Sequence, residues 1–292
     1  MANLSLADGR TLEYLVAGPA DGMPLVLHSG TPSAARFHDP MVATATKHGL
    51  RTIAISRPGY AGSTAQPGRT VGSAALDVAA VLDAIGASQF LTVGWSGGGP
   101  HALACAALLP ERCLGAATVA GVAPYTAADL DWLAGMGAEN IEEFGAAVAG
   151  SVPLGDYLTA QLPALTDVTG DQVADSLGDL ISDVDRRALT GDFADFMATA
   201  FRAAVSTGIN GWRDDDLAFI EEWGFDLTAI TTPVAVWQGE QDRMVPYAHG
   251  RWLATHVPGA TVHLEPAEGH LSLMLLAFDA ILGELKGWVS SR

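Results

Sequence analysis

Short apolar segments alternate with longer amphipathic ones along most of the chain, and this alternation limits the possible folds more than any other feature. Segments with the length and apolar content of buried strands lie early in the chain at residues 12–16, 25–28, 52–56 and 90–95. Segments with helical periodicity lie between them at residues 37–48 and 71–85. Strands that alternate with helices form parallel sheets covered on both faces. The sequence therefore predicts an α/β fold.

The alternation continues to residue 124, stops, and resumes at residue 229. A helix at 100–109 and a strand at 116–120 precede the break; strands at 233–239 and 261–264 and helices at 247–256 and 271–289 follow it. Between them, apolar residues recur at helical spacing in two groups: Val173, Leu177, Leu180, Ile181 and Val184, then Phe193, Phe196, Met197, Ala200 and Phe201. We expect residues 1–124 and 229–292 to form one core domain. Residues 125–228 are expected to form an inserted helical cap over the carboxyl edge of the sheet.

The composition limits which cofactors, metals and cellular locations are expected. The 292 residues are 49% hydrophobic, enough for a full-sized core. Cys105 and Cys113 are the only cysteines and are expected to be core thiols, because two are too few for a disulfide framework or a metal cage. No common metal or nucleoside-triphosphate motif occurs, so we expect neither metal nor cofactor. No secretory signal or membrane-spanning apolar stretch is evident, which predicts a cytoplasmic protein without membrane association.

The formal net charge of −18 disfavours nucleic acid and anionic membranes as partners, because both require basic patches. The charge is unevenly distributed. Residues 125–228 contain 20 Asp and Glu against four Arg, a net charge of −16, so the remainder of the chain carries only −2. The acidity belongs to the predicted cap. The sequence leaves open whether the protein is a monomer or a homo-oligomer.

A Gly-x-Ser-x-Gly pattern joins the strand at 90–95 to the helix that follows. A sharp strand-to-helix turn strains its central residue and brings chain segments close together, so small residues are needed two positions before and after it. Gly94 and Gly98 occupy these positions around Ser96. Ser96 would then lie near a helix N-terminus, whose unpaired N–H groups favour negative charge. The pattern predicts Ser96 as a nucleophile.

The same loop has two other possible interpretations, a structural turn and a nucleotide-binding loop. It is an ordinary glycine-rich turn if no catalytic partners accompany Ser96. It also fits the Gly-x-Gly-x-x-Ala fingerprint of dinucleotide binding over residues 97–102. That fingerprint requires an acidic residue about 20 positions on, at the end of the next strand, and residues 119–122 contain none. Nucleotide binding is therefore disfavoured.

A serine hydroxyl needs a general base, and a histidine base needs a carboxylate that fixes its tautomer. Where a Gly-x-Ser-x-Gly turn carries the nucleophile, the acid and then the histidine follow the serine along the chain. Four histidines lie late enough: His249, His256, His263 and His270. His270 stands in the loop after the last predicted strand, whereas His256 ends a helix and His263 lies within a strand. Asp242 follows the penultimate strand at the same sheet edge and is the predicted acid, with Glu240 as the fallback.

An acyl-transfer site also needs backbone donors for the oxyanion. The N–H of Gly97, directly after the predicted nucleophile, is one candidate. The N–H of Thr31, in the loop after an early strand, is the other. Taken alone, the loop at residues 29–32 would be interpreted as a simple Gly-Thr-Pro turn.

These segments together resemble the α/β-hydrolase superfamily over nearly the whole chain apart from the predicted cap. The matching segments are Ser29-Gly30-Thr31-Pro32, Arg57-Pro58-Gly59-Tyr60-Ala61-Gly62-Ser63, Gly94-Trp95-Ser96-Gly97-Gly98, Gly239-Glu240-Gln241-Asp242 and Gly269-His270. The family usually has His-Gly where this chain has Ser29-Gly30, and an aspartate where it has Ser56. The resemblance implies an eight-stranded, mostly parallel sheet flanked by helices, with a helical lid. The chain looks like bacterial members described as esterases or proline-iminopeptidase-like hydrolases, and it lacks the aspartate that epoxide hydrolases and dehalogenases have in place of Ser96.

We therefore expect a serine hydrolase that cleaves small-molecule carboxylic esters or related acyl compounds through an acyl-enzyme on Ser96. A rival function is that of an aminopeptidase whose cap carboxylates hold the amino group of the substrate. The candidate carboxylates are Glu139, Glu142 and Glu143. The alternative is that these three residues lie on solvated helix faces and bind nothing. A cofactor-free perhydrolase or carbon–carbon bond hydrolase is also compatible with these residues, and a non-catalytic receptor is the least favoured class. Four aromatic residues are candidates for the substrate pocket, although core packing would explain them equally well: Trp95, Phe193, Phe196 and Trp212.

Overall fold

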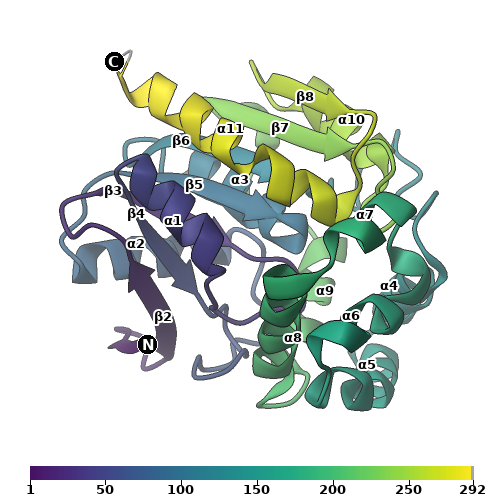
Figure 1. Ribbon diagram of the computed structural model, residues 1–292. Helices are drawn as coiled ribbons and strands as arrows, with labels where there is room; N and C mark the ends of the chain where they lie inside the picture. The colour runs from purple at the N-terminus through teal and green to yellow at the C-terminus, as the bar shows by residue number, and fades with distance from the viewer. Residues whose placement is uncertain (291–292) are drawn as a thin grey trace.

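The computed structural model describes residues 1–290, so the last two residues of the predicted core domain lie outside it. Its centre is an eight-stranded sheet in the order β1-β2-β4-β3-β5-β6-β7-β8 (Figure 1). The strands are β1 (Ala2–Ser5), β2 (Thr11–Ala17), β3 (Met23–His28), β4 (Leu50–Ile55), β5 (Phe90–Trp95), β6 (Cys113–Val119), β7 (Val234–Gly239) and β8 (Thr261–Glu265).

The sheet is mostly parallel. Strands β3 to β8 pair in parallel with their neighbours, whereas β2 pairs antiparallel with both β1 and β4. This confirms the predicted fold class. The sequence patterns missed β1, which is short, lies at the sheet edge and exposes most of its side chains. Its register is set by Leu4, which stands opposite Leu12 in β2.

Helices cover both faces of the sheet, as the α/β alternation requires. In Figure 1, α1 and α11 cross in front of the sheet and α3 lies behind it. Helix α2 packs against α3, and α10 packs on β7 and β8. Both cysteines are buried, Cys105 within α3 and Cys113 at the start of β6. These core helices are α1 (Asp39–Lys47), α2 (Ser73–Ala84), α3 (Gly99–Leu108), α10 (Tyr247–His256) and α11 (His270–Ser290).

The chain between β6 and β7 forms helices that gather beside one end of the sheet (Figure 1). We call residues 125–228 the helical segment. Its helices are α4 (Ala138–Ala149), α5 (Ser151–Thr166), α6 (Gly170–Ser176), α7 (Asp183–Ala188), α8 (Gly191–Val205) and α9 (Asn210–Ile220). The helical spacing from Val173 to Val184 does not form one helix, because Gly178 has a φ of 49° and separates α6 from α7. Within residues 1–290, no helix has both the length and the apolar character needed to cross a membrane.

The turn from β5 to α3 is the closest crossing of backbone in the core. A Cβ atom added at Gly94 would lie 2.1 Å from the carbonyl oxygen of Gly98. A Cβ atom at Gly98 would lie 2.0 Å from the carbonyl oxygen of His28, at the end of β3. Real Cβ atoms do not approach backbone this closely. Both glycines are therefore required by packing, as the sequence pattern predicted.

Replacing Gly98 by Ala should destabilise the protein by about 3 kcal/mol, because the new methyl group must displace main chain rather than a flexible side chain. Gly145 is the matched control. It lies in α4 with nothing within 4 Å of an added Cβ, and Gly145→Ala should stabilise the protein by about 0.5–1 kcal/mol through helix propensity. Denaturant unfolding of both variants measures the difference. Equal changes in the free energy of unfolding would contradict this view of the crossing.

Candidate active site

A cavity of about 170 Å³ lies between the helical segment and the loops that follow β3, β5 and β7. Ser96 and His270 both line it, as do Thr31 and Gly97. The predicted nucleophile, the predicted base and the two candidate oxyanion donors therefore line one cavity. The opposite wall is largely apolar and comes from the helical segment; it includes Phe144, Leu165, Leu177, Leu180, Phe196, Met197, Phe201, Trp212 and Phe219.

Ser96 directly follows β5 and has a φ of 58°. This left-handed conformation is strained for any residue with a side chain. The residue then enters a single 3-10 turn (Ser96–Gly98) that leads into α3. Gly30 lies beside it, since a Cβ atom at Gly30 would be 3.1 Å from the Cβ of Ser96. The turn therefore holds the hydroxyl group at the cavity rather than in the sheet.

His270 and Asp242 form a buried pair. The Nδ1 atom of His270 lies 2.8 Å from Oδ2 of Asp242. The other carboxylate oxygen accepts hydrogen bonds from the N–H groups of Met244 and Val245, at 2.9 and 2.8 Å. Gln238 donates a further hydrogen bond to Oδ2 at 3.1 Å. The carboxylate is thus fixed, and Nε2 of the imidazole is left as the nitrogen that can exchange a proton.

The electrostatics of this pair favour a basic imidazole. Burial alone would lower the pKa of His270, but the charge and hydrogen bond of Asp242 raise it above its usual value. Burial raises the pKa of Asp242, against the effects of His270 and of the Val245 N–H group. The fallback acid Glu240 is exposed and makes no contact with His270 within the described chain.

The other late histidines have structural contacts. His249 is buried between the N–H of Ala123 and the carbonyl of Trp132, and burial lowers its pKa to about 4. His263 stacks on Trp237 with ring centroids 3.7 Å apart. His256 stacks on Trp252 at 3.8 Å. None of the three lines the cavity.

The loop that contains Thr31 is held by Arg57, a residue whose role sequence reasoning missed. The guanidinium donates to the carbonyl oxygens of Ser29 and Gly30, at 2.7 and 2.8 Å, and to the hydroxyl oxygen of Thr31 at 3.0 Å. Gly97 lies directly against this loop, because a Cβ atom there would be 2.5 Å from Oγ1 of Thr31. The two candidate oxyanion donors are therefore neighbours beside Ser96.

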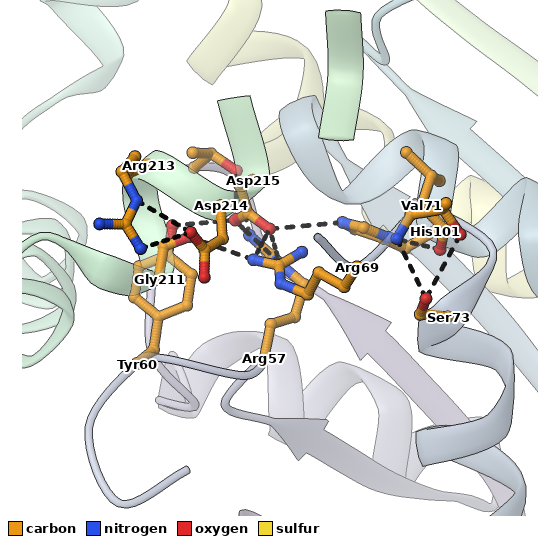
Figure 2. Close-up of polar contacts among 12 residues, drawn as sticks. Arg57, Tyr60, Arg69, Val71, Ser73, His101, Gly211, Arg213, Asp214 and Asp215 are labelled. Carbon is orange, nitrogen blue, oxygen red and sulfur yellow. Dashed lines mark hydrogen bonds and ion pairs between the residues drawn. The ribbon is translucent and has the colours of Figure 1, made fainter. Parts of the chain in front are cut away.

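Arg57 is in turn fixed by Asp215, from α9 of the helical segment. Figure 2 shows the guanidinium groups of Arg57 and Arg69 meeting its carboxylate, each at 2.6 Å. The hydroxyl groups of Tyr60 and Thr31 also donate to it, at 2.8 and 2.9 Å. Burial alone would raise the pKa of Asp215, but the charges of the two arginines hold it well below its usual value. Asp215 is therefore a buried carboxylate with two cationic partners.

The next residue, Asp216, has a different environment. It is 1% exposed and lines the cavity, and neither of its carboxylate oxygens accepts a hydrogen bond from a donor in residues 1–290. Glu143 of α4 lines the cavity next to it and accepts a hydrogen bond from Nε1 of Trp212 at 2.7 Å. Burial, and then the negative charge of Glu143, raise the pKa of Asp216 well above its usual value. This carboxyl pair has no arginine or lysine in contact within the described chain.

Only some of the aromatic and acidic residues predicted as pocket candidates line the cavity. Trp95, Phe196 and Trp212 line the cavity. Phe193 does not; it packs against Trp95, at 6.4 Å between ring centroids, and faces a smaller adjoining cavity. Its helical spacing matched that of Phe196, but it lies on a neighbouring face of α8. Glu139 lines the cavity together with Glu143, whereas Glu142 is exposed.

Comparison with known proteins agrees with the observed fold. The family model for the alpha/beta hydrolase fold matches residues 24–275. A non-heme chloroperoxidase of Streptomyces lividans is 30% identical over 259 residues, which cover 85% of this chain and 84% of that protein. Among solved structures, a hydrolase from Pseudomonas aeruginosa has a TM-score of 0.69 at 20% identity, with 99% and 97% of the two chains covered. The enol-lactonase from Burkholderia xenovorans has a TM-score of 0.68 at 20% identity and covers 99% of this chain and 100% of its own.

The two solved structures are only 20% identical to this chain, so their similarity supports the fold alone. The family model spans residues 24–275, which include Ser96, Asp242 and His270, and the Streptomyces relative extends over most of the sequence. The chain belongs to the alpha/beta hydrolase fold family.

Proposed function

We propose that the protein is a serine hydrolase that cleaves carboxylic esters through an acyl-enzyme on Ser96. The observation that carries the proposal is the buried His270–Asp242 pair, which opens on the same cavity as a serine in a strained strand-to-helix turn. A serine, a histidine and a carboxylate in this arrangement are the components of nucleophilic acyl transfer. The helical segment would act as the cap that covers the acyl group.

In the proposed mechanism, Nε2 of His270 accepts the proton of the Ser96 hydroxyl as its oxygen attacks the acyl carbonyl. The N–H groups of Gly97 and Thr31 stabilise the oxyanion. His270 then donates the proton to the departing alcohol, and water, activated by the same imidazole, cleaves the acyl-enzyme. Asp242 stabilises the imidazolium throughout. Esters are favoured over amides because an alkoxide leaves more readily than an amine anion and so depends less on proton transfer to the leaving group.

A fluorophosphonate probe should label the protein once, on the peptide that contains Ser96, because only an activated serine reacts. Ser96→Ala should abolish labelling and lower kcat for ester hydrolysis by on the order of 10⁶. The same assay with added hydrogen peroxide separates hydrolysis from perhydrolysis, since only perhydrolysis yields a peracid. Undiminished turnover by Ser96→Ala would end the serine-hydrolase proposal.

Asp242→Asn should leave the protein folded but reduce kcat by on the order of 10⁴, because an asparagine amide donates to Nδ1 and holds the imidazole in the wrong tautomer. Glu240→Gln, an exposed change in the same loop, is the control and should retain nearly all activity. The measurements are kcat, the rate of probe labelling and the midpoint of thermal unfolding. A collapse of kcat in Glu240→Gln beside normal turnover in Asp242→Asn would show that the acid was wrongly assigned.

One observation favours a second candidate, hydrolysis of amides or esters that bear an amino group, as in an aminopeptidase. Glu143 and Asp216 are two adjacent carboxyls in the cavity wall, and no arginine or lysine of the described chain is in contact with them. Burying such a pair is costly unless a proton or a cation compensates it. A protonated amine on the substrate would supply that charge, with the apolar wall holding the rest of the acyl group.

A cationic ester should therefore be a better substrate than its neutral isostere. In the double variant Glu143→Gln with Asp216→Asn, kcat/KM for the cationic ester should fall by about tenfold to a hundredfold, the scale of one or two hydrogen bonds to a charged group. Hydrolysis of the neutral ester should change little. Glu142→Gln, an exposed change on the same helix, is the control. Equal losses for both esters would refute a cation site, and cleavage of an amino-acid arylamide would favour the aminopeptidase.

A further inference from the structure

Helix α11 begins at His270, so the catalytic imidazole of the proposed mechanism belongs to the first residue of a helix. The first N–H groups of any helix have no partner within the helix. The usual solution is a side-chain oxygen on the residue before the first turn. Here that residue is Gly269, which has no side chain to supply one.

A residue far away in the sequence satisfies these groups. Asp185, in α7 of the helical segment, accepts the N–H of His270 on Oδ2 at 3.0 Å. Its Oδ1 accepts the N–H groups of Leu271 and Ser272, at 2.7 and 3.0 Å. The hydroxyl of Ser182 also donates to Oδ2 at 2.9 Å. Asp185 is 0% exposed, so all of these hydrogen bonds are shielded from water.

Gly269 is part of the same arrangement. A Cβ atom at this position would lie 2.3 Å from a carboxylate oxygen of Asp185. Its own N–H donates to Oγ of Ser272 at 2.9 Å. The turn before His270 is thus built to admit a carboxylate from another part of the chain. This explains the glycine of the Gly269-His270 pair by a contact that no local pattern reveals.

We propose that Asp185 is a positioning residue for the catalytic histidine: it caps the helix that carries His270 and adds a second buried negative charge beside the imidazole. The proposal rests on the role of His270 in the proposed function. Because Asp185 belongs to α7, it also ties the position of the imidazole to the docking of the helical segment. Movement of α7 away from α11 would leave three buried N–H groups without an acceptor.

The charges around the imidazole all act in one direction. Asp242 contacts its Nδ1 atom from the loop after β7, whereas Asp185 of α7 contacts the backbone N–H of the same residue. Trp95, whose ring centroid lies 5.6 Å from that of the imidazole, donates to the His270 carbonyl but carries no charge. Burial lowers the pKa of His270, whereas both carboxylates raise it. Each therefore stabilises the imidazolium that forms during acyl transfer.

The test compares Asp185→Asn with Asp183→Asn. Asp183 is exposed on the same helix, so its variant makes the same change of charge without the contact. NMR titration of the His270 ring gives its pKa without requiring turnover, and kcat/KM as a function of pH gives the pKa of the working base. In Asp185→Asn we expect both values to fall by about one unit, the effect of removing one nearby charge, and kcat to fall about tenfold. Asp183→Asn should match the wild type.

Asp185→Glu separates charge from position. It retains the negative charge but displaces the carboxylate oxygens from the N–H groups, so the imidazole pKa should stay near that of the wild type while kcat falls. A lower midpoint of thermal unfolding in Asp185→Asn, with the pKa of His270 and kcat both unchanged, would overturn the proposal and leave Asp185 as a helix cap only. Since the titration does not depend on catalysis, this outcome is distinct from failure of the ester-hydrolase proposal, which Ser96→Ala tests.

Discussion

The buried carboxylate of Asp215 is the interaction on which much of the architecture depends. It joins α9 of the helical segment to two arginines of the core, and through Arg57 to the backbone of the loop beside Ser96. Removing one partner from such a buried network leaves an uncompensated charge and costs about 3–5 kcal/mol. Replacing the whole network by apolar residues would not carry that penalty, and the hypothesis that follows is that the network serves specificity more than stability. It fixes one docking geometry for the helical segment and one conformation for the loop.

Three consecutive aspartates therefore have three different environments. Asp214 pairs with Arg213 at 2.8 Å, Asp215 with two core arginines, and Asp216 with the cavity and Glu143. Successive residues of a helix point about 100° apart, so one short run of like residues reaches three different surroundings in turn. The formal charge of the helical segment is consequently not a uniform surface field. Part of it is neutralised in the core, and part is directed into the cavity.

The fold was largely predictable from sequence, because β and helical periodicities are local properties. The strand at residues 90–95 and the helix at 247–256 were predicted at their observed bounds, and the Gly-x-Ser-x-Gly pattern identified the tight crossing that Gly94 and Gly98 make. The break at Gly178 was missed, since apolar spacing continues across it and only its backbone conformation ends the helix. Phe193 packs against Trp95 beside the smaller cavity, the core-packing alternative that the sequence had left open, because spacing identifies a buried face but not which cavity that face borders. The positions of Asp185 and Asp215 were beyond such patterns, because the N–H groups that Asp185 caps lie 85 to 87 residues away along the chain, and Arg69 and Thr31 lie 146 and 184 residues from Asp215.

The conformation of Ser96 has a consequence for how such a protein can change over evolutionary time. A positive φ is tolerated by glycine without strain, so a glycine at this position would relax the turn and make the fold more stable. It would also remove the hydroxyl group. Selection for stability alone would therefore favour glycine here, and the strained serine fits the nucleophilic role proposed for Ser96.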